Sequence, residues 1–132
     1  MKKNMSKQIP EVLAPAGDYE CLQAAVRFGA DAVYLGATRF GMRASSATFT
    51  EDLLNRGVKL AHQNGVRIYL TCNTIPTNEE IDAFPDFLKE IGKAGVDALI
   101  VTDLGVLSLV KKYLPEMEVH ISTQAGVVNY LT

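Results

Sequence analysis

The sequence predicts an α/β fold with a parallel sheet, arranged as part of a TIM-barrel-like (β/α) barrel. Three features carry this prediction: apolar strand-like runs alternate with amphipathic stretches, a glycine-led phrase recurs along the chain, and two expected strands have one polar face. The 132 residues, 48% of them hydrophobic, provide enough apolar material for one globular domain.

The recurring phrase marks three junctions between a helix and a strand. It begins at Gly29, Gly65 and Gly95, and each time a run of apolar residues starts within three positions. A glycine directly after a helix fits the left-handed C′ position, where a side chain would cost steric energy. Each phrase is therefore expected to end one helix and begin the next strand.

The remaining elements follow in regular order. Asp18, Thr50 and Asn78 have good N-cap side chains and are expected to begin three helices. The expected strands cover residues 11–15, 32–36, 67–73, 98–103 and 118–123, and the expected helices cover residues 18–28, 50–63, 78–93 and 104–113. This alternation predicts sequential parallel strands with right-handed crossovers. We interpret residues 1–9 as a flexible leader and residues 10–132 as one domain.

A doubly wound open sheet and a (β/α)8 barrel both fit this order, and the strand faces favour the barrel. The third expected strand places Ile68 and Leu70 on one side and Arg67 and Thr71 on the other, and the fifth strand repeats the alternation. An open sheet covered by helices buries both faces, whereas the interior of a barrel mouth accommodates a polar face. The sequence thus predicts a half-barrel of four βα units and a fifth strand.

The length predicts that the barrel is truncated. A complete barrel of this kind takes roughly 250 residues, so we expect this chain to be a fragment of a longer protein. Uncovered sheet edges are ready templates for further pairing, and the fragment is therefore expected to self-associate.

Composition narrows the class of protein. A net charge of −2 provides no general attraction for nucleic acid, and no apolar run reaches the length of a signal peptide or a membrane span. Cys21 and Cys72 lack the spacing of a disulfide framework, so we expect free thiols in the cytoplasm, with Cys21 buried as a small hydrophobe. No membrane partner is expected.

Active sites of parallel barrels lie at the carboxyl ends of the strands, and polar residues gather at those positions here. Asn73 follows the third strand, Asp103 follows the fourth, and His120 lies in the fifth. We interpret these three as catalytic candidates. For His120 the alternatives are a general base, a metal ligand or a histidine satisfied by a neighbouring group. Asp103 is at least as well explained as the N-cap of the helix beginning at Leu104.

Four further residues suit substrate binding. Arg39 and Arg43 flank an aromatic residue in a glycine-containing loop, and their guanidinium groups suit phosphate or carboxylate, although such arginines can also pair with nearby acids. Ser122 and Gln124 lie on the same side of the fifth strand as His120. No H-E-x-x-H, phosphate-binding loop or dinucleotide fingerprint is present, and we expect no metal site and no cofactor in this chain.

Several motifs, in the same order, resemble the collagenase-like peptidase family U32. They are EVLAPAG at 11–17, GADAVYLG at 29–36, RFGMR at 39–43, NT at 73–74, DALIVTDLG at 97–105 and HISTQ at 120–124. The resemblance runs from about Pro10 to the last residue.

This resemblance implies two kinds of activity. The family takes its name from collagen degradation, whereas other members take part in hydroxylating transfer RNA wobble uridine, ribosomal RNA cytidine or a ubiquinone precursor. Those members are linked to prephenate and in several cases to an iron–sulfur cluster, which the longer protein could carry. A peptidase needs an activated nucleophile or a metal-bound water, and the visible motifs include neither. We therefore expect RNA hydroxylation first, with RNA or an anion such as prephenate as partner, a peptidase acting on protein second, and a non-catalytic binding module third.

Overall fold

The computed structural model describes residues 9–36, 49–72 and 77–131, and these residues build one five-stranded parallel sheet. The strands follow one another in chain order from β1 to β5, which confirms the predicted sequential pairing. They are β1 (Leu13–Pro15), β2 (Ala32–Gly36), β3 (Arg67–Cys72), β4 (Ala98–Val101) and β5 (Glu118–Ile121). The sheet is not closed, so β1 and β5 form its two edges. Residues 1–8 of the expected leader lie outside the described residues.

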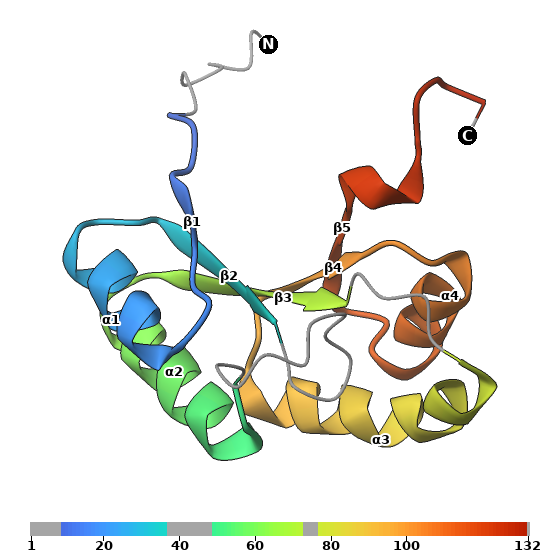
Figure 1. Ribbon diagram of the computed structural model, residues 1–132, viewed down its shortest axis with the longest axis horizontal. Coiled ribbons are helices and arrows are strands. Elements are labelled where there is room, and N and C mark those ends of the chain that lie inside the picture. The colour runs from blue at the N-terminus through green and yellow to red at the C-terminus, as the bar shows by residue number, and fades with distance from the viewer. Residues whose placement is uncertain (1–8, 37–48, 73–76, 132) are drawn as a thin grey trace, which may run out of the picture.

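The four helices pack on one face of this sheet (Figure 1). They are α1 (Tyr19–Arg27), α2 (Glu51–Gln63), α3 (Asn78–Ala94) and α4 (Leu104–Tyr113), and a short 3-10 helix, η1 (Thr123–Ala125), follows β5. A doubly wound sheet would carry helices on both faces, and the described part of the chain has none on the second face. None of the described helices is both long enough and apolar enough to span a bilayer.

Side chains that alternate along each strand supply the core beneath the helices. Ile68 and Leu70 of β3 point to this side, as the sequence pattern predicted, and both are fully buried. The helices add Leu22, Leu88 and Ile91 to the same cluster. Burial of such aliphatic side chains contributes about 1.5–3 kcal/mol each, so this layer provides most of the apolar driving force for folding.

The recurring phrase has a structural reason beyond its glycine. Gly29, Gly65 and Gly95 have φ values of 91°, 69° and 83°, which confirms the predicted left-handed turn after each helix. Two of the phrases continue with an aspartate, and each carboxylate binds a neighbouring strand segment. Asp31 accepts a hydrogen bond from the Val12 amide at 2.8 Å, and Asp97 accepts one from the Ile68 amide at 2.7 Å. The phrase therefore both turns the chain and holds adjacent segments in register.

Two of the three expected N-caps are confirmed. Asp18 and Thr50 accept backbone hydrogen bonds at the starts of α1 and α2, but the prediction for Asn78 is wrong. Thr77 is the N-cap of α3, because its hydroxyl accepts from the Glu80 amide while the Glu80 carboxylate accepts from the Thr77 amide at 2.6 Å. This reciprocal pair satisfies two amides at once, which an Asn78 cap could not do with the same glutamate.

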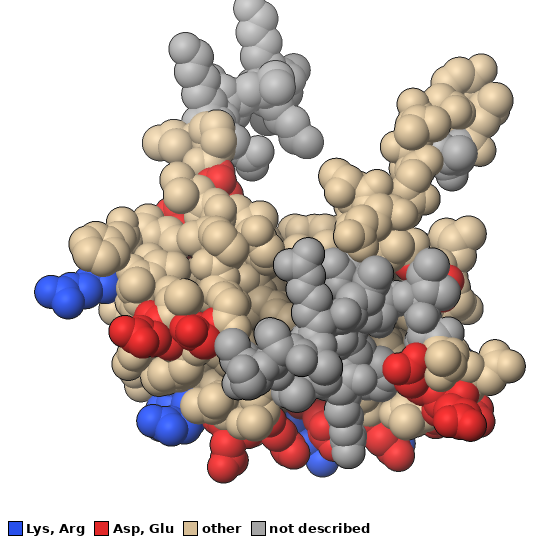
Figure 2. Space-filling model, in the orientation of Figure 1, with Lys and Arg blue, Asp and Glu red and all other residues tan. Residues whose placement is uncertain are grey.

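The surface differs between the helical side and the sheet edges. Figure 2 shows acidic and basic side chains along the helical side of the molecule, whereas the described surface that leads to the C-terminus is mostly uncharged. Several large hydrophobic residues are exposed near the two edges of the sheet. Ile9, Val12 and Leu13 lie in or before β1, Ile121 ends β5, and Val127, Val128, Tyr130 and Leu131 follow β5. Exposed apolar side chains therefore lie near both unpaired edges of the sheet.

Candidate functional site

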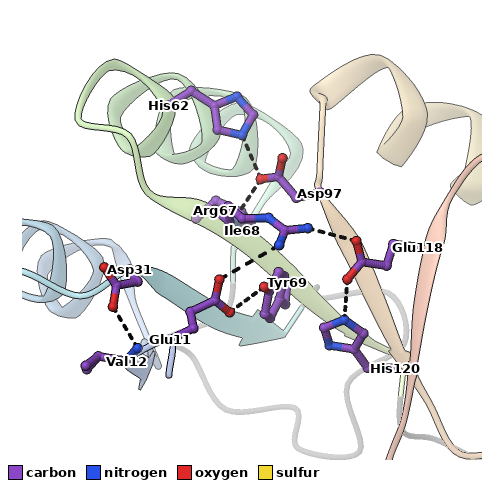
Figure 3. Close-up of polar contacts among 10 residues, drawn as sticks. All are labelled: Glu11, Val12, Asp31, His62, Arg67, Ile68, Tyr69, Asp97, Glu118 and His120. Atoms are coloured by element: carbon purple, nitrogen blue, oxygen red, sulfur yellow. Dashed lines mark hydrogen bonds and ion pairs between the residues drawn. The ribbon is translucent and has the colours of Figure 1, made fainter. Parts of the chain in front are cut away.

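The face of the sheet opposite the helices carries a polar cluster from three segments (Figure 3). We name it the open-face cluster, and its members are Glu11, Arg67, Tyr69, Glu118 and His120. Arg67 and Tyr69 share this face because they alternate along β3, and Glu118 and His120 share it because they alternate along β5. The Cα atom of Ala98 on β4 is in register with both Tyr69 and Glu118, so one small residue separates the two strands' side chains.

Glu118 is the centre of this cluster. Its Oε2 atom accepts a hydrogen bond from the Arg67 guanidinium at 2.9 Å, and its Oε1 atom lies 2.6 Å from Nε2 of His120. The hydrogen bond with His120, followed by the bond with Arg67, lowers the pKa of the Glu118 carboxyl below its ordinary value of 4.5. Glu118 is therefore ionised near neutral pH and acts as an acceptor only.

Tyr69 connects Arg67 and His120 to Glu11, in the segment that precedes β1. Its hydroxyl donates to Oε1 of Glu11 at 2.5 Å, the Arg67 guanidinium lies 5.3 Å from its ring centroid, and its ring meets the His120 ring edge-on at 4.7 Å. Burial, and then the hydrogen bond with Glu11, raises the pKa of Tyr69 to about 12. Tyr69 therefore remains a neutral hydrogen-bond donor.

Small neighbours explain why an arginine fits at the start of β3. Arg67 is in register with Ala32 of β2, and Ala98 of β4 pairs one position further along the same face. The alanines leave the guanidinium room to cross the sheet toward β5. The hydrogen bond with Glu118 is the main cause of the raised pKa of Arg67, so its positive charge is permanent.

The other expected site residues lie where the strands end. Asp103 caps α4, with its Oδ1 atom accepting from the Val106 amide at 3.0 Å. Ser122 caps η1 by accepting from the Gln124 amide at 3.2 Å, and its own amide donates to the carbonyl of Val101. The capping interpretation of Asp103 is thus confirmed. The side chains of Asp103 and Ser122 accept from backbone amides, Gln124 contacts Ser122 through its own amide, and none of these contacts joins the three residues to His120.

Three predicted residues cannot be placed. Arg39, Arg43 and Asn73 lie outside the described residues. His120 is described, and it lies on the open face as expected, but its partner Glu118 was not expected.

Sequence reasoning missed four members of the open-face cluster: Glu11, Arg67, Tyr69 and Glu118. Functional side chains were expected at the carboxyl ends of the strands, whereas Arg67 and Glu118 are the first residues of β3 and β5. Alternation along the strands indicates three of the four, because Arg67 and Tyr69 share one side of β3 and Glu118 lies on the same side of β5 as His120.

The two cysteines lie in different environments. Cys72 lies in the core, and burial raises the pKa of its thiol to about 12. Cys21 is exposed, so the prediction that it is buried is wrong; the neighbouring Leu22 takes the inward position on α1. The described residues contain no group of three or more histidine, cysteine or acidic side chains placed to hold a metal ion.

Comparison with known proteins relates the chain to one family. Residues 17–132 match the model of peptidase family U32. The chain is 39% identical to tRNA hydroxylation protein P1 of Bacillus subtilis over 97% of its own length and 30% of the relative. It is 38% identical to the 23S rRNA 5-hydroxycytidine C2501 synthase of Escherichia coli, covering 89% of this chain and 17% of that protein.

A relative named for proteolysis matches at a similar level. The collagenase of Porphyromonas gingivalis is 37% identical over 90% of this chain and 28% of its own length. The chain therefore spans less than a third of each of these three relatives.

Proposed function

Because this chain belongs to peptidase family U32, we propose that the longer protein takes part in RNA hydroxylation, with transfer RNA wobble uridine as its first candidate substrate. The observation that carries this proposal is the similarity to proteins named for hydroxylation of two RNA classes, transfer RNA and 23S ribosomal RNA. We also propose that this reaction takes place in the cytoplasm.

We further propose that the chain forms one part of a TIM-barrel-like barrel. Two features support this: the helices cover only one face of the sheet, and the other face is lined by the open-face cluster rather than by apolar side chains alone (Figures 1 and 3). In a closed barrel that face would line the interior. With part of its wall missing, this chain alone is expected to be inactive.

The proposed ligand of the site is RNA together with a small anion such as prephenate. Arg39 and Arg43 are the proposed anion-binding residues because guanidinium groups bind carboxylates in a bidentate manner. Asn73, Ser122 and Gln124 are proposed to line the same end of the barrel. His120 is the proposed proton-transfer group, because histidine is the side chain most often used for general acid–base catalysis. An iron–sulfur cluster, if the longer protein carries one, would need cysteines beyond this chain.

A peptidase is the second candidate, because a collagenase is among the relatives. The described residues favour it less. Cysteine proteolysis needs a thiolate, and both thiols have raised pKa values, Cys21 mainly through its hydrogen bond with Asp18 and Cys72 through burial. Both histidines contact carboxylates, His62 with Asp97 and His120 with Glu118, and no hydrogen bond among the described residues joins either histidine to a serine, threonine or cysteine side chain.

Nucleoside analysis of a deletion strain tests the proposal. Removing the gene should eliminate a hydroxylated nucleoside from digested cellular RNA, measured by mass spectrometry, and the wild-type gene should restore it. Purified full-length protein should leave gelatin intact. An unchanged nucleoside profile together with gelatin cleavage by the purified protein would establish the peptidase instead.

A variant of the arginine loop sharpens this test. Arg43→Ala should remove a charge-assisted pair worth about 1.5–3 kcal/mol, roughly a ten- to hundredfold loss of affinity for an anion. The modified nucleoside should then fall to the level of the deletion strain, whereas Arg27→Ala at the end of α1 should leave it unchanged.

A further inference from the structure

Each oxygen of the Glu118 carboxylate contacts a different partner. Oε1 contacts Nε2 of His120 at 2.6 Å and Oε2 contacts the guanidinium of Arg67 at 2.9 Å. A carboxylate held at both oxygens has little freedom to rotate. The imidazole of His120 is therefore held against a group that is itself anchored (Figure 3).

Arg67 in turn contacts Glu11, in the segment that precedes β1. Its NH1 atom lies 3.8 Å from Oε2 of Glu11, and the other oxygen of Glu11 accepts the Tyr69 hydroxyl at 2.5 Å. Contacts thus run from Glu11 through Arg67 and Glu118 to His120, across the full width of the sheet. Only a fixed sheet register keeps these four side chains within reach of one another.

The contact with Glu118 distinguishes the two nitrogens of His120. An ionised carboxylate can only accept, so the neutral imidazole carries its proton on Nε2 and donates it to Glu118. Nδ1 then holds the free lone pair. Among the described residues, the charged or titratable groups on the side of His120 are Glu118 on β5 and Arg67, Tyr69 and Glu11 beyond it. Strand β4 contributes the uncharged Ala98 and Ile100.

We propose that Glu118 is a positioning residue that binds Nε2 of His120 and leaves Nδ1 to exchange a proton with the ligand, with Arg67 fixing Glu118. This inference rests on the proposed function, in which His120 transfers a proton. When Nδ1 accepts a proton, the ligand's bond to that proton breaks, an N–H bond forms, and Glu118 stabilises the resulting imidazolium. The later return of the same proton leaves the enzyme unchanged.

The test uses the full-length protein in the deletion strain, with protein abundance measured beside the modified nucleoside. Glu118→Gln keeps the size of the side chain but removes its charge, and it should lower the nucleoside per molecule of protein about tenfold or more. Glu118→Asp keeps a carboxylate and should recover part of that loss. Glu116→Gln makes the same change on an exposed residue two positions earlier and should have no effect.

A spectroscopic measurement separates positioning from a structural role. In the purified wild-type protein, the Nε2 proton of His120 should give a downfield, slowly exchanging imidazole N–H resonance. Glu118→Gln should remove this resonance while leaving the backbone amide spectrum folded, and Glu116→Gln should retain it. An unchanged imidazole resonance in Glu118→Gln would overturn the positioning role.

His120→Gln separates a failure of the positioning role of Glu118 from a failure of the proposed function. If His120→Gln abolishes the modification but Glu118→Gln at normal abundance does not reduce it, the positioning role is overturned and RNA hydroxylation stands. If His120→Gln retains full modification, both the role of His120 and that of Glu118 are overturned. If the deletion strain keeps the nucleoside, the proposed function itself fails.

Discussion

The two faces of the same sheet are built on different principles. The helix-covered face contains closely packed aliphatic side chains such as Ile68, Leu70 and Leu99, all fully buried. On the open face, the described buried residues form only a small cluster of Ala32, Tyr69 and Ala98. Partly buried Ile100 packs against this cluster, and the charged side chains of the open-face cluster lie on the same face. Alternate residues of one strand thus serve two environments.

The difference shows that the ion pairs of the open-face cluster contribute little to the free energy of folding. Its charged side chains are 37–49% exposed, and ion pairs at that exposure contribute only about 0–1 kcal/mol. The helix-covered face contributes far more per residue through apolar burial. Four side chains that add little stability yet are held across three segments are better explained by function, as proposed for His120.

The largest expected effect compares two neighbours in β4. Leu99→Ala should lower the free energy of unfolding by about 2–5 kcal/mol, because it leaves a cavity beneath the helices. Ile100→Ala, on the open face and only partly buried, should cost less than half as much. Urea unfolding of the purified protein measures both, and equal losses would mean that the open face is packed as tightly as the covered one.

A change of opposite sign is expected at the end of β4. Among the described residues that are not exposed, the Thr102 hydroxyl is a buried side-chain group without a hydrogen-bond partner. Thr102→Val has nearly the same shape and removes this group, so it should raise the free energy of unfolding by about 1–3 kcal/mol. Thr71→Val, which removes a hydroxyl bonded to the Leu35 carbonyl, is the control and should lower stability instead. Destabilisation by Thr102→Val would show that its hydroxyl has a partner.

A smaller effect concerns the start of α3 in the helical layer. Thr77→Ala breaks the capping box with Glu80 and should cost about 1 kcal/mol. Asn78→Ala lies one position inside the helix and should change stability by no more than about 0.5 kcal/mol. Thermal unfolding of the two variants compares them directly, and a larger loss for Asn78→Ala would restore Asn78 as the cap.

The smallest expected effect is the pH dependence of the open-face cluster. The pKa of Glu118 is lowered in the folded state, so the folded protein binds fewer protons than the unfolded chain as pH falls below about 4.5. The stabilisation by Glu118 is therefore present above that pH and is lost as pH falls through the lowered folded pKa.

Glu118→Gln removes this contribution. The stability of the variant should decline less steeply below pH 4.5 than that of the wild type, by less than about 1 kcal/mol because the pair is half exposed. Urea midpoints measured between neutral and acid pH provide the comparison. A steeper decline in the variant would contradict the lowered pKa.

Much of the fold could be predicted because its signals are local. The glycines at 29, 65 and 95 end helices through their own backbone freedom, and the faces of β3 and β5 follow from alternation along one strand. The N-cap of α3 was misplaced by one residue, since Thr77 and Asn78 both suit a cap and only the reciprocal bond with Glu80 selects between them.

Local sequence patterns were sufficient to predict the order of the strands, the side of the sheet on which each strand residue lies, and the presence of His120 on the polar side. Which polar groups meet depends on the packing of strands that are distant in the chain. Tyr69 and Glu11 are 58 residues apart in the chain, and Arg67 and Glu118 are 51 apart. Their contacts depend on the stagger between strands, which brings Ala98 opposite both Tyr69 and Glu118. Periodicity along a single strand carries no information about that stagger, because it is set by hydrogen bonds and packing between strands.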